Sequence, residues 1–503
     1  MTCWHQHRFM DTEATLEFRH GFARLGDQFF TRVAPEALPD PYLVSVNPAM
    51  AHILGLEKKQ FSSQAFVDYF SGSRLPEGAD PLAMLYAGHQ FGHFVPQLGD
   101  GRAILLGELE DAEGQLWELQ LKGAGETPYS RNGDGRAVLR STIREYLCSE
   151  AMHGLGIPTT RALCITGSDE EVYREQIESA AVLARMAPSH VRFGSFEVFY
   201  YRNQHDRLEK LADYMLTRHF PHLADQPDAC LAMFSEVVQS TARLIAQWQL
   251  AGFAHGVMNT DNMSMLGLTL DYGPYGFLDA YDPDFICNHS DHEGRYAFSR
   301  QPSIGHWNLT CLAQAMLPLF SDEPDAAVEM AQDALNGYET AFMKTYSDGM
   351  RAKLGLMTRG REDHALVTDL LRLMQANQVD YTRFFRALAD FRVSEDGQQS
   401  AAADEFVDRQ AFWQWAKGYG QRLEQENRRD EERRAAMCSV NPKYILRNYL
   451  VQNAIEKAER RDFSEIDRLL ELLAKPFDEQ PEHERYAALP PDWAKTISIS
   501  CSS

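Results

Sequence analysis

The chain contains 503 residues, 44% hydrophobic and 24% charged, an ordinary globular composition that allows one large core or two to three domains. The formal net charge of -23 argues against nucleic acids and anionic membranes as partners, because binding their phosphates needs a basic surface. No apolar run approaches the roughly 20 residues of a membrane helix, and the first residues show no secretory signal.

Residues 1–85 mix short apolar clusters with prolines and are expected to form an N-terminal extension packed on the core. A β-rich lobe is expected over residues 86–187. Within it, residues 102–109 form a mainly apolar run, and residues 117–121 alternate between apolar and polar side chains, which is typical of a strand. Turn residues at 111–114 separate the two runs, so the sequence predicts a β-hairpin.

Helices are predicted from the spacing of apolar residues. Residues 138–155 carry a stripe at every fourth position and are followed by Gly156 and Pro158. A second helical stretch is expected over about residues 171–186. Residues 229–250 have the pattern of a long amphipathic helix.

The later part of the chain, from Asp279 to about residue 475, is predominantly helical in its pattern. A helical lobe with the catalytic and metal loops is expected over residues 188–400. A helical C-terminal extension with a tail follows over residues 401–503. This order of elements predicts an α+β protein with a bilobal, protein-kinase-like fold.

One loop carries most of the polar chemistry. His255-Gly-Val-Met-Asn-Thr-Asp261-Asn262 is followed nine residues later by Asp271-Tyr-Gly. The apolar runs between Asn262 and Asp271, with Gly267 at their turn, predict a short hairpin that brings these two residues together. An amide oxygen and a carboxylate at one point suit Mg²⁺, and the spacing is that of kinase catalytic and metal-binding loops.

One position departs from a kinase. Two residues after His255, where a kinase has its catalytic aspartate, the chain has Val257. Asp261 is the only carboxylate inside the loop and is therefore the candidate that accepts a proton from an incoming hydroxyl. An Asx turn before the hairpin also accounts for Asp261.

A lysine and a glutamate stand in the order that kinases use to hold nucleotide phosphates. Lys122 ends the second predicted strand, and Glu145 lies on the helix that follows. A surface lysine and an unrelated helix glutamate are the alternative. The order Lys122, Glu145, Asn262, Asp271 favours the kinase-like interpretation.

Two glycine-rich stretches are candidates for nucleotide contacts. Gly99 and Gly101 let backbone N–H groups approach a phosphate, and Arg102 has the geometry for a bidentate contact. Plain turns have the same pattern. Asp134 and Gly135 belong to a second stretch, for which a surface loop is the alternative.

Two arginines, Arg185 and Arg192, flank the expected junction between the lobes. In a strongly acidic protein, arginines at such a position are either structural ion pairs or phosphate clamps. The residues alone leave both interpretations open.

Eight cysteines without short regular spacing indicate a reducing compartment and mostly buried thiols, and we expect a cytoplasmic protein. The segment Cys287-Asn-His-Ser-Asp-His292 fits no strong zinc pattern. Cys501, third from the end, is either incidental or redox-active.

The stretch from Tyr86-Ala-Gly-His-Gln-Phe-Gly-His-Phe94 to Trp307-Asn-Leu309 resembles the SelO (selenoprotein O) family of protein adenylyltransferases. Asn441-Pro-Lys-Tyr-Ile-Leu-Arg-Asn-Tyr449 and the terminal Cys501-Ser-Ser503 are similar to it too. Members have a kinase fold without the catalytic aspartate, which Val257 fits. The resemblance implies a nucleotidyltransferase that moves AMP from ATP to Ser, Thr or Tyr hydroxyls of proteins, itself included, with ATP reversed relative to a kinase.

The resemblance also implies a role for each candidate residue. It places Gly99, Gly101 and Arg102 in the phosphate loop, Lys122 on a phosphate, Asp134 and Gly135 on the nucleotide, Arg185 and Arg192 on phosphates, Asn262 and Asp271 on Mg²⁺ or Mn²⁺, and Asp261 as the proton acceptor. In bacterial-type members a cysteine like Cys501 pairs with one like Cys287, which implies a disulfide that would gate activity by redox state.

Three other functions are compatible with these residues. A nucleotide-binding pseudokinase scaffold would be indifferent to the loss of Asp261. An ordinary kinase using Asp261 as its base would transfer label from γ-labelled and not α-labelled ATP. A Mn²⁺-dependent uridylyltransferase, which would use UTP, is also compatible with the sequence, because contacts to the base cannot be read from it.

Overall fold

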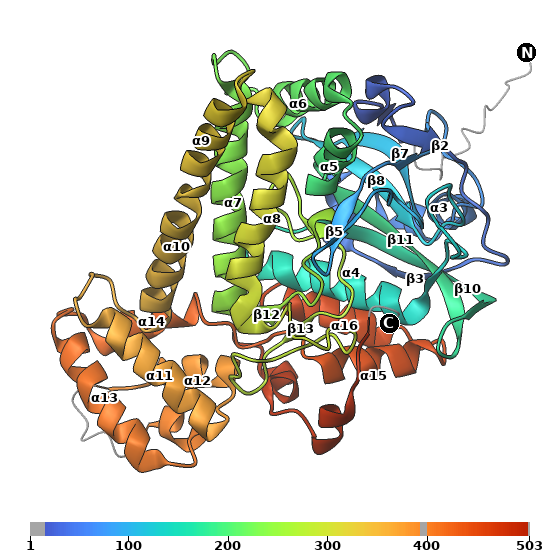
Figure 1. Cartoon of the computed structure of the whole chain (residues 1–503). Coiled ribbons are helices and arrows are strands. Elements are labelled where there is room, and N and C mark those ends of the chain that lie inside the picture. Colours follow the sequence, from blue (N-terminus) through green and yellow to red (C-terminus); the bar gives the residue numbers. More distant parts are fainter. Residues whose placement is uncertain (1–15, 393–399, 501–503) are drawn as a thin grey trace, which may run out of the picture. The chain divides into compact units, whose positions relative to one another are not determined.

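The computed structural model describes residues 16–392 and 400–500, which divide into two compact units (Figure 1). The first unit comprises residues 16–85, 99–142 and 161–190, and the second comprises residues 86–98, 143–160 and 191–500. Within these described stretches, no helix combines the length and the apolar composition that crossing a membrane requires.

The first unit is built on a nine-stranded antiparallel sheet. Its main path runs β2-β4-β7-β8-β11-β10-β3, while β1 pairs with β7 and β9 with β11. The strands are β1 (Phe18–Arg19), β2 (Phe30–Arg32), β3 (Tyr42–Val46), β4 (Leu82–Met84), β7 (Ala103–Glu110), β8 (Leu116–Lys122), β9 (Ala137–Val138), β10 (Arg161–Tyr173) and β11 (Ile177–Ala187).

The predicted hairpin is confirmed as β7 and β8, and its turn is held by Asp111. The Asp111 carboxylate accepts hydrogen bonds from the backbone N–H of Glu113 and Gln115 and from the indole of Trp117, each 2.9 Å long. Residues 16–85 contribute four strands to the same sheet. Phe66 and Phe70 of α3 (Gln64–Phe70) are buried in the same core as Leu119 and Leu121.

The helix predicted over residues 171–186 is wrong. These residues end β10 and form most of β11, joined by a turn in which Arg174 N donates to Gln176 O at 3.0 Å. Residues 180–187 are buried on both faces, so the run lacks the alternation of a half-exposed strand, and its alanines favour a helix locally. Pairing with β8 and β10 overrides that propensity.

The second unit is mainly helical. Predicted helices at 138–155 and 229–250 are confirmed as α4 and α7. Among the described residues, α1 (Pro48–Ile53) and α2 (Lys58–Phe61) belong to the first unit, whereas most of α4 and all of α5 to α16 belong to the second. Their bounds are α4 (Leu139–Gly154), α5 (Phe193–Tyr201), α6 (His205–His219), α7 (Ala229–Ala251), α8 (Gln301–Met316), α9 (Pro324–Leu335), α10 (Gly337–Lys353), α11 (Asp363–Asn377), α12 (Tyr381–Leu388), α13 (Arg409–Glu424), α14 (Asp430–Cys438), α15 (Asn448–Ala458) and α16 (Ser464–Leu473).

The helices α7, α8 and α10 lie side by side in Figure 1, and the second unit also contains two small hairpins. One hairpin pairs β5 (Gly88–Gln90) with β6 (His93–Val95), and the other pairs β12 (Phe253–Ala254) with β13 (Gly276–Phe277). Gly252 ends α7 with φ of 70°, a left-handed conformation suited to glycine. The chain then enters the His255 loop directly.

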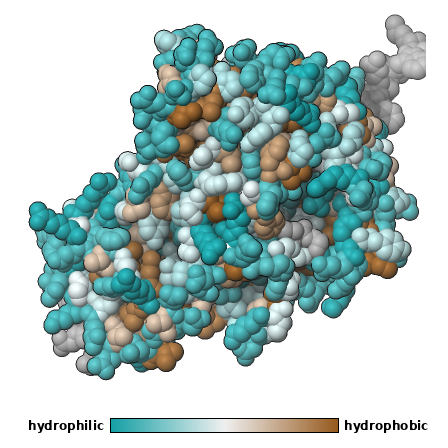
Figure 2. Space-filling model, in the orientation of Figure 1, coloured by the Kyte–Doolittle hydropathy of each residue, from teal (hydrophilic) through white to brown (hydrophobic). Residues whose placement is uncertain are grey.

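Antiparallel strands in one unit and helices in the other confirm the α+β class. The kinase-like bilobal arrangement and the domain boundaries at 85, 187 and 400 stay predictions. The face shown in Figure 2 is largely hydrophilic, with apolar residues in small scattered groups, which agrees with the strongly acidic composition.

Candidate active site

The first unit brings Lys122 and Arg185 to one face of its sheet. In the β8–β11 register, Leu183 lies opposite Lys122 and Arg185 opposite Gln120. Residues directly opposite each other in an antiparallel pair share a face, and so do positions two apart along a strand. Lys122 and Arg185 therefore project from the same face.

That face of β8 is polar but buried. Gln120 donates to Asp100 at 2.9 Å and accepts from Arg185 Nε at 3.1 Å. Glu118 accepts from the backbone N–H and Nδ1 of His190 at 2.7 and 2.8 Å. The alternation predicted for residues 117–121 is present. Its polar residues, however, belong to a buried hydrogen-bonded network that holds the Arg185 guanidinium in place.

The glycines of the first predicted phosphate loop are explained by packing. Gly99 has φ of 136°, and a Cβ there would lie 2.5 Å from the Tyr129 ring. A Cβ on Gly101 would lie 2.9 Å from the Tyr129 carbonyl oxygen. Arg102 follows them, and its carbonyl accepts from Gly123 N at 2.6 Å. The segment therefore lies beside the end of β8, where Lys122 is located.

The second glycine-rich stretch is a tight loop of the first unit. A Cβ on Gly135 would lie 2.0 Å from the Gly125 carbonyl oxygen, so only glycine fits there. Asp134 pairs with Arg174 through contacts of 2.8 Å. That guanidinium keeps the pKa of the Asp134 carboxyl below its usual value.

In the second unit, the catalytic loop is anchored by His255. Its ring is buried, Nε2 donates to Leu270 O at 2.9 Å, and Nδ1 accepts from Val257 N at 3.3 Å. Burial lowers the pKa of His255, so the neutral ring holds the start of the loop to the residue before Asp271.

Arg192 joins the two parts of this loop system. It precedes α5, and its Nη1 donates to the Asp261 carbonyl oxygen at 2.6 Å and also contacts the Asp271 carboxylate. Its guanidinium lies 4.8 Å above the Tyr86 ring. The Arg192 guanidinium therefore holds the Asp261 carbonyl and the Asp271 carboxylate close to each other, as the predicted hairpin requires.

The hairpin itself is less regular than predicted. Met263 and Thr269 form an isolated antiparallel bridge, with Gly267 at φ of 64°, instead of two paired strands. Other backbone N–H groups of this stretch form hydrogen bonds to neighbouring segments instead. Met265 N donates to Val191 O at 3.1 Å, and Thr269 N donates to Pro158 O at 2.9 Å. The closure is confirmed, but the prediction of two strands is wrong.

Asn262 and Asp271 have the chemistry to hold a hard divalent cation. The Asn262 amide nitrogen donates to Val257 O at 3.0 Å, which orients its oxygen away from that contact. Asp271 has φ of 55°, a left-handed conformation that aspartate tolerates better than most residues. Carboxylate and amide oxygens are the ligands that Mg²⁺ and Mn²⁺ prefer.

Asp261 is buried beside these residues. Its Oδ2 accepts from Gln90 at 3.1 Å, and its Oδ1 accepts no hydrogen bond from the described residues. A Cβ on Gly88 would lie 2.5 Å from Oδ1, so the glycine is needed for the close approach. Burial raises the pKa of Asp261 to about 7, within the range useful to a general base near neutral pH.

Three other predicted residues have separate positions. Glu145 is buried on α4, and its pairing with Lys122 stays a prediction. Cys287 is buried, with Sγ 3.5 Å from the Ala254 carbonyl oxygen. Cys501 lies outside the described residues.

Sequence reasoning missed the part played by Gln90 and Glu197. Gln90 lies in the stretch 86–94, which carries part of the family resemblance but has no role predicted from the sequence. Glu197 is the one charged residue of α5, between Phe196 and Val198. A carboxylate inside an apolar helix needs polar partners, and this was the available signal.

Comparison with known proteins gives consistent results. Residues 12–474 match the family model described as "Protein adenylyltransferase SelO". The chain is 57% identical over 488 residues to "Protein nucleotidyltransferase YdiU" of Thioalkalivibrio sulfidiphilus, covering 97% of this chain and 99% of that protein. It is 56% identical over 495 residues to the protein of the same name from Thiobacillus denitrificans, covering 98% and 100%, and 55% identical over 494 residues to that from Myxococcus xanthus, covering 98% and 100%.

Proposed function

The chain belongs to the SelO family of protein adenylyltransferases, and from this premise we propose that it transfers AMP from ATP to Ser, Thr or Tyr hydroxyls of proteins. It is a nucleotidyltransferase by family. The acceptor hydroxyls, the reversed ATP, the metal and the redox control are the proposed parts.

One observation carries the proposal. Arg192 contacts both the Asp261 carbonyl and the Asp271 carboxylate, so the proton acceptor and the metal ligand belong to one local arrangement. Val257 leaves no carboxylate at the usual kinase position. The buried, incompletely bonded Asp261 carboxylate is then the group suited to receive a hydroxyl proton.

The proposed step is a displacement at the α-phosphorus. The acceptor oxygen forms a bond to Pα as the bond from Pα to the bridging oxygen breaks, and pyrophosphate leaves. Asp261 accepts the hydroxyl proton. Mg²⁺ or Mn²⁺ held by Asn262 and Asp271 would supply positive charge for the α-phosphate oxygens.

The remaining phosphates need cationic partners in this orientation. Lys122 and Arg185 share a face of the first unit's sheet, and Arg192 belongs to the second unit. We assign these three residues to the β- and γ-phosphates, with Gly99, Gly101 and Arg102 as the phosphate loop and Asp134 and Gly135 on the nucleotide. Glu145 is assigned to orienting Lys122, in a kinase-like fold.

The experiment that tests the function uses the purified chain with a protein acceptor, Mn²⁺ or Mg²⁺, and ATP labelled at either the α- or the γ-phosphate. Label from α-labelled ATP and an added AMP mass are expected, with none from γ-labelled ATP. Transfer of γ-label would instead mean an ordinary kinase. Incorporation from UTP in preference to ATP would mean uridylylation, and binding without any transfer would mean a scaffold.

The redox proposal has independent local support. His289 N donates to Ile499 O at 2.9 Å, so the tail is bound two residues from Cys287 and two residues before Cys501. A Cβ on Gly256 would lie 2.7 Å from Cys287 Sγ, so this sulfur packs against the catalytic loop. We propose that an oxidant such as a small disulfide takes two electrons and two protons from the thiols to form Cys287–Cys501. The expected cytoplasmic location stays a prediction, and there the bond would be transient.

Oxidised protein digested without reductant is expected to yield a peptide pair joined through Cys287 and Cys501. The pair should disappear after reduction and in Cys501→Ser, but persist in Cys438→Ser, a matched control at a partly exposed cysteine. Transfer rates of the oxidised and reduced protein should differ, and the difference should vanish in Cys501→Ser. Absence of the linked pair from oxidised wild-type protein would refute this control mechanism.

A further inference from the structure

The hairpin formed by β5 and β6 contacts the catalytic loop residue by residue. Residues 89, 90 and 91 of the hairpin each donate one hydrogen bond to the segment 259–261. The bonds are His89 N to Thr260 Oγ1 at 2.7 Å, Gln90 Nε2 to Asp261 Oδ2 at 3.1 Å, and Phe91 N to Asn259 Oδ1 at 3.1 Å. Successive bonds of this kind fix both the register and the distance of the loop.

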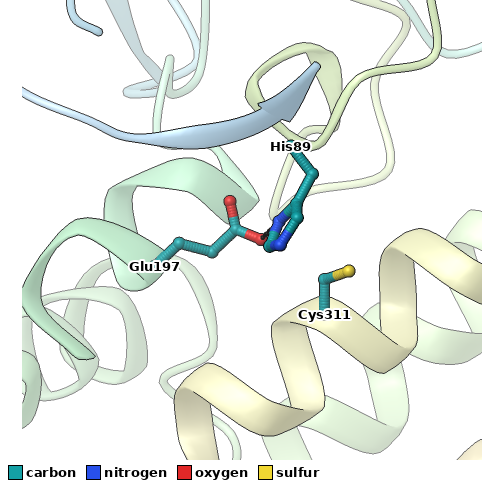
Figure 3. A group of neighbouring side chains, drawn as sticks. All are labelled: His89, Glu197 and Cys311. Carbon is teal, nitrogen blue, oxygen red and sulfur yellow. Dashed lines mark hydrogen bonds and ion pairs between the residues drawn. The ribbon is translucent and has the colours of Figure 1, made fainter. Parts of the chain in front are cut away.

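Glu197 closes this arrangement from α5 (Figure 3). One of its oxygens bonds His89 Nδ1 at 2.8 Å, and the other accepts from the Thr260 hydroxyl at 2.6 Å. The carboxylate is fully buried. Since His89 N also donates to the same hydroxyl, Glu197, His89 and Thr260 form a closed ring of hydrogen bonds immediately before Asp261.

The same cluster has the composition of a metal site. Ligand atoms of His89, Glu197 and Cys311 lie within 4.8 Å of one another (Figure 3). Both Glu197 oxygens are already engaged by His89 and Thr260, and Cys311 has no such bond to either. Hydrogen bonding to the catalytic loop therefore explains the cluster better than metal binding does.

We infer that Glu197, with His89 and Gln90 of the hairpin, is a positioning element that holds Asp261 and the adjoining loop for nucleotide transfer. This inference rests on the proposed function and deepens it. Glu197 acts through Thr260, and Gln90 acts directly on the Asp261 carboxylate. A displacement of about 1 Å at a reacting group costs on the order of 100-fold in rate, so loss of these contacts should lower kcat more than ATP binding.

The test compares Glu197→Ala, Glu197→Gln and Gln90→Ala with wild type in α-labelled ATP transfer. We expect kcat to fall roughly 10- to 100-fold in Glu197→Ala and Gln90→Ala, with KM for ATP changed by less than about twofold. Glu197→Gln should retain part of the rate, because its amide oxygen still accepts one hydrogen bond. His93→Ala is the matched control, since His93 is exposed on the other strand of the same hairpin, and it should match wild type.

Hydrogen exchange of the peptide covering residues 255–263 gives a second readout that needs no activity. Faster exchange in Glu197→Ala, but not in His93→Ala, is expected. Unchanged exchange and unchanged kcat in an active protein would overturn the inference alone. Wild type without transfer would overturn the proposed function, while the exchange result still decides whether Glu197 holds the loop. One bound zinc per chain, lost in Cys311→Ser, would overturn the inference in favour of a metal site.

Discussion

Replacing Asp271 by asparagine is expected to abolish AMP transfer while leaving the fold intact. The change keeps the size of the side chain and suits the left-handed backbone at φ of 55°, because asparagine adopts that region readily. It removes the charge that would hold the metal and that contacts Arg192. Loss of several kcal/mol of transition-state stabilisation corresponds to a fall of at least about 1,000-fold.

Transfer of α-label, monitored with increasing Mn²⁺, is the measurement. Asp284→Asn is the matched control, because Asp284 lies further along the same segment with an exposed side chain. It should transfer at the wild-type rate. Melting temperatures of both variants should be close to that of wild type. If Asp271→Asn is active and high Mn²⁺ does not change its activity, Asp271 is not a metal ligand.

Replacing Asp261 by asparagine is expected to lower transfer by roughly 100- to 10,000-fold, the usual contribution of a general base. Binding of ATP should persist, because the change leaves Asn262, Asp271 and Arg192 in place. The amide oxygen of the new residue can still accept from Gln90, which donates at 3.1 Å in the wild type. The variant therefore removes proton acceptance with little change in packing.

The measurement pairs calorimetric ATP binding with α-labelled transfer. Retained binding with lost transfer would support the role of Asp261. Wild-type transfer in Asp261→Asn would show that another group receives the proton. Loss of ATP binding together with transfer would point to a structural role, and Asn259→Ser, which changes a neighbouring loop residue bonded to Tyr296 at 2.6 Å, serves as a comparison for loop disruption.

Local patterns in the sequence predicted the elements whose partners lie nearby in the chain. The β7–β8 hairpin has its own turn residue in Asp111. The apolar face of α7 can be predicted from the spacing of its own residues, without knowing what packs against it. The closure of the loop between Asn262 and Asp271 was predictable for the same reason. The short strands expected there were not formed, because Val191 and Pro158 from distant segments compete for the backbone groups.

The rest depended on contacts between distant segments. Strand β11 contains an alanine-rich run that is compatible with a helix until β8 and β10 pair with it. The partners of Asp261 and Thr260 come from Gln90 and Glu197, which are separated from them by 171 and 63 positions. Spacing within a motif carries no information about such partners. The sequence therefore predicts the loop that carries the candidate residues, but not the distant residues that contact it.

The sheet of the first unit has an unusual consequence for how the chain must be assembled. Strands β2 and β3 are neighbours in sequence, yet they form opposite ends of the path β2-β4-β7-β8-β11-β10-β3. The five strands between them are synthesised later, and β3 waits for β10, which begins at Arg161. Such distant pairings slow folding, because the entropic cost of closing a long loop is incurred before the stabilising contacts form. During synthesis β2 can pair as soon as β4 has emerged, whereas β3 has no partner strand in the sheet until β10 is made.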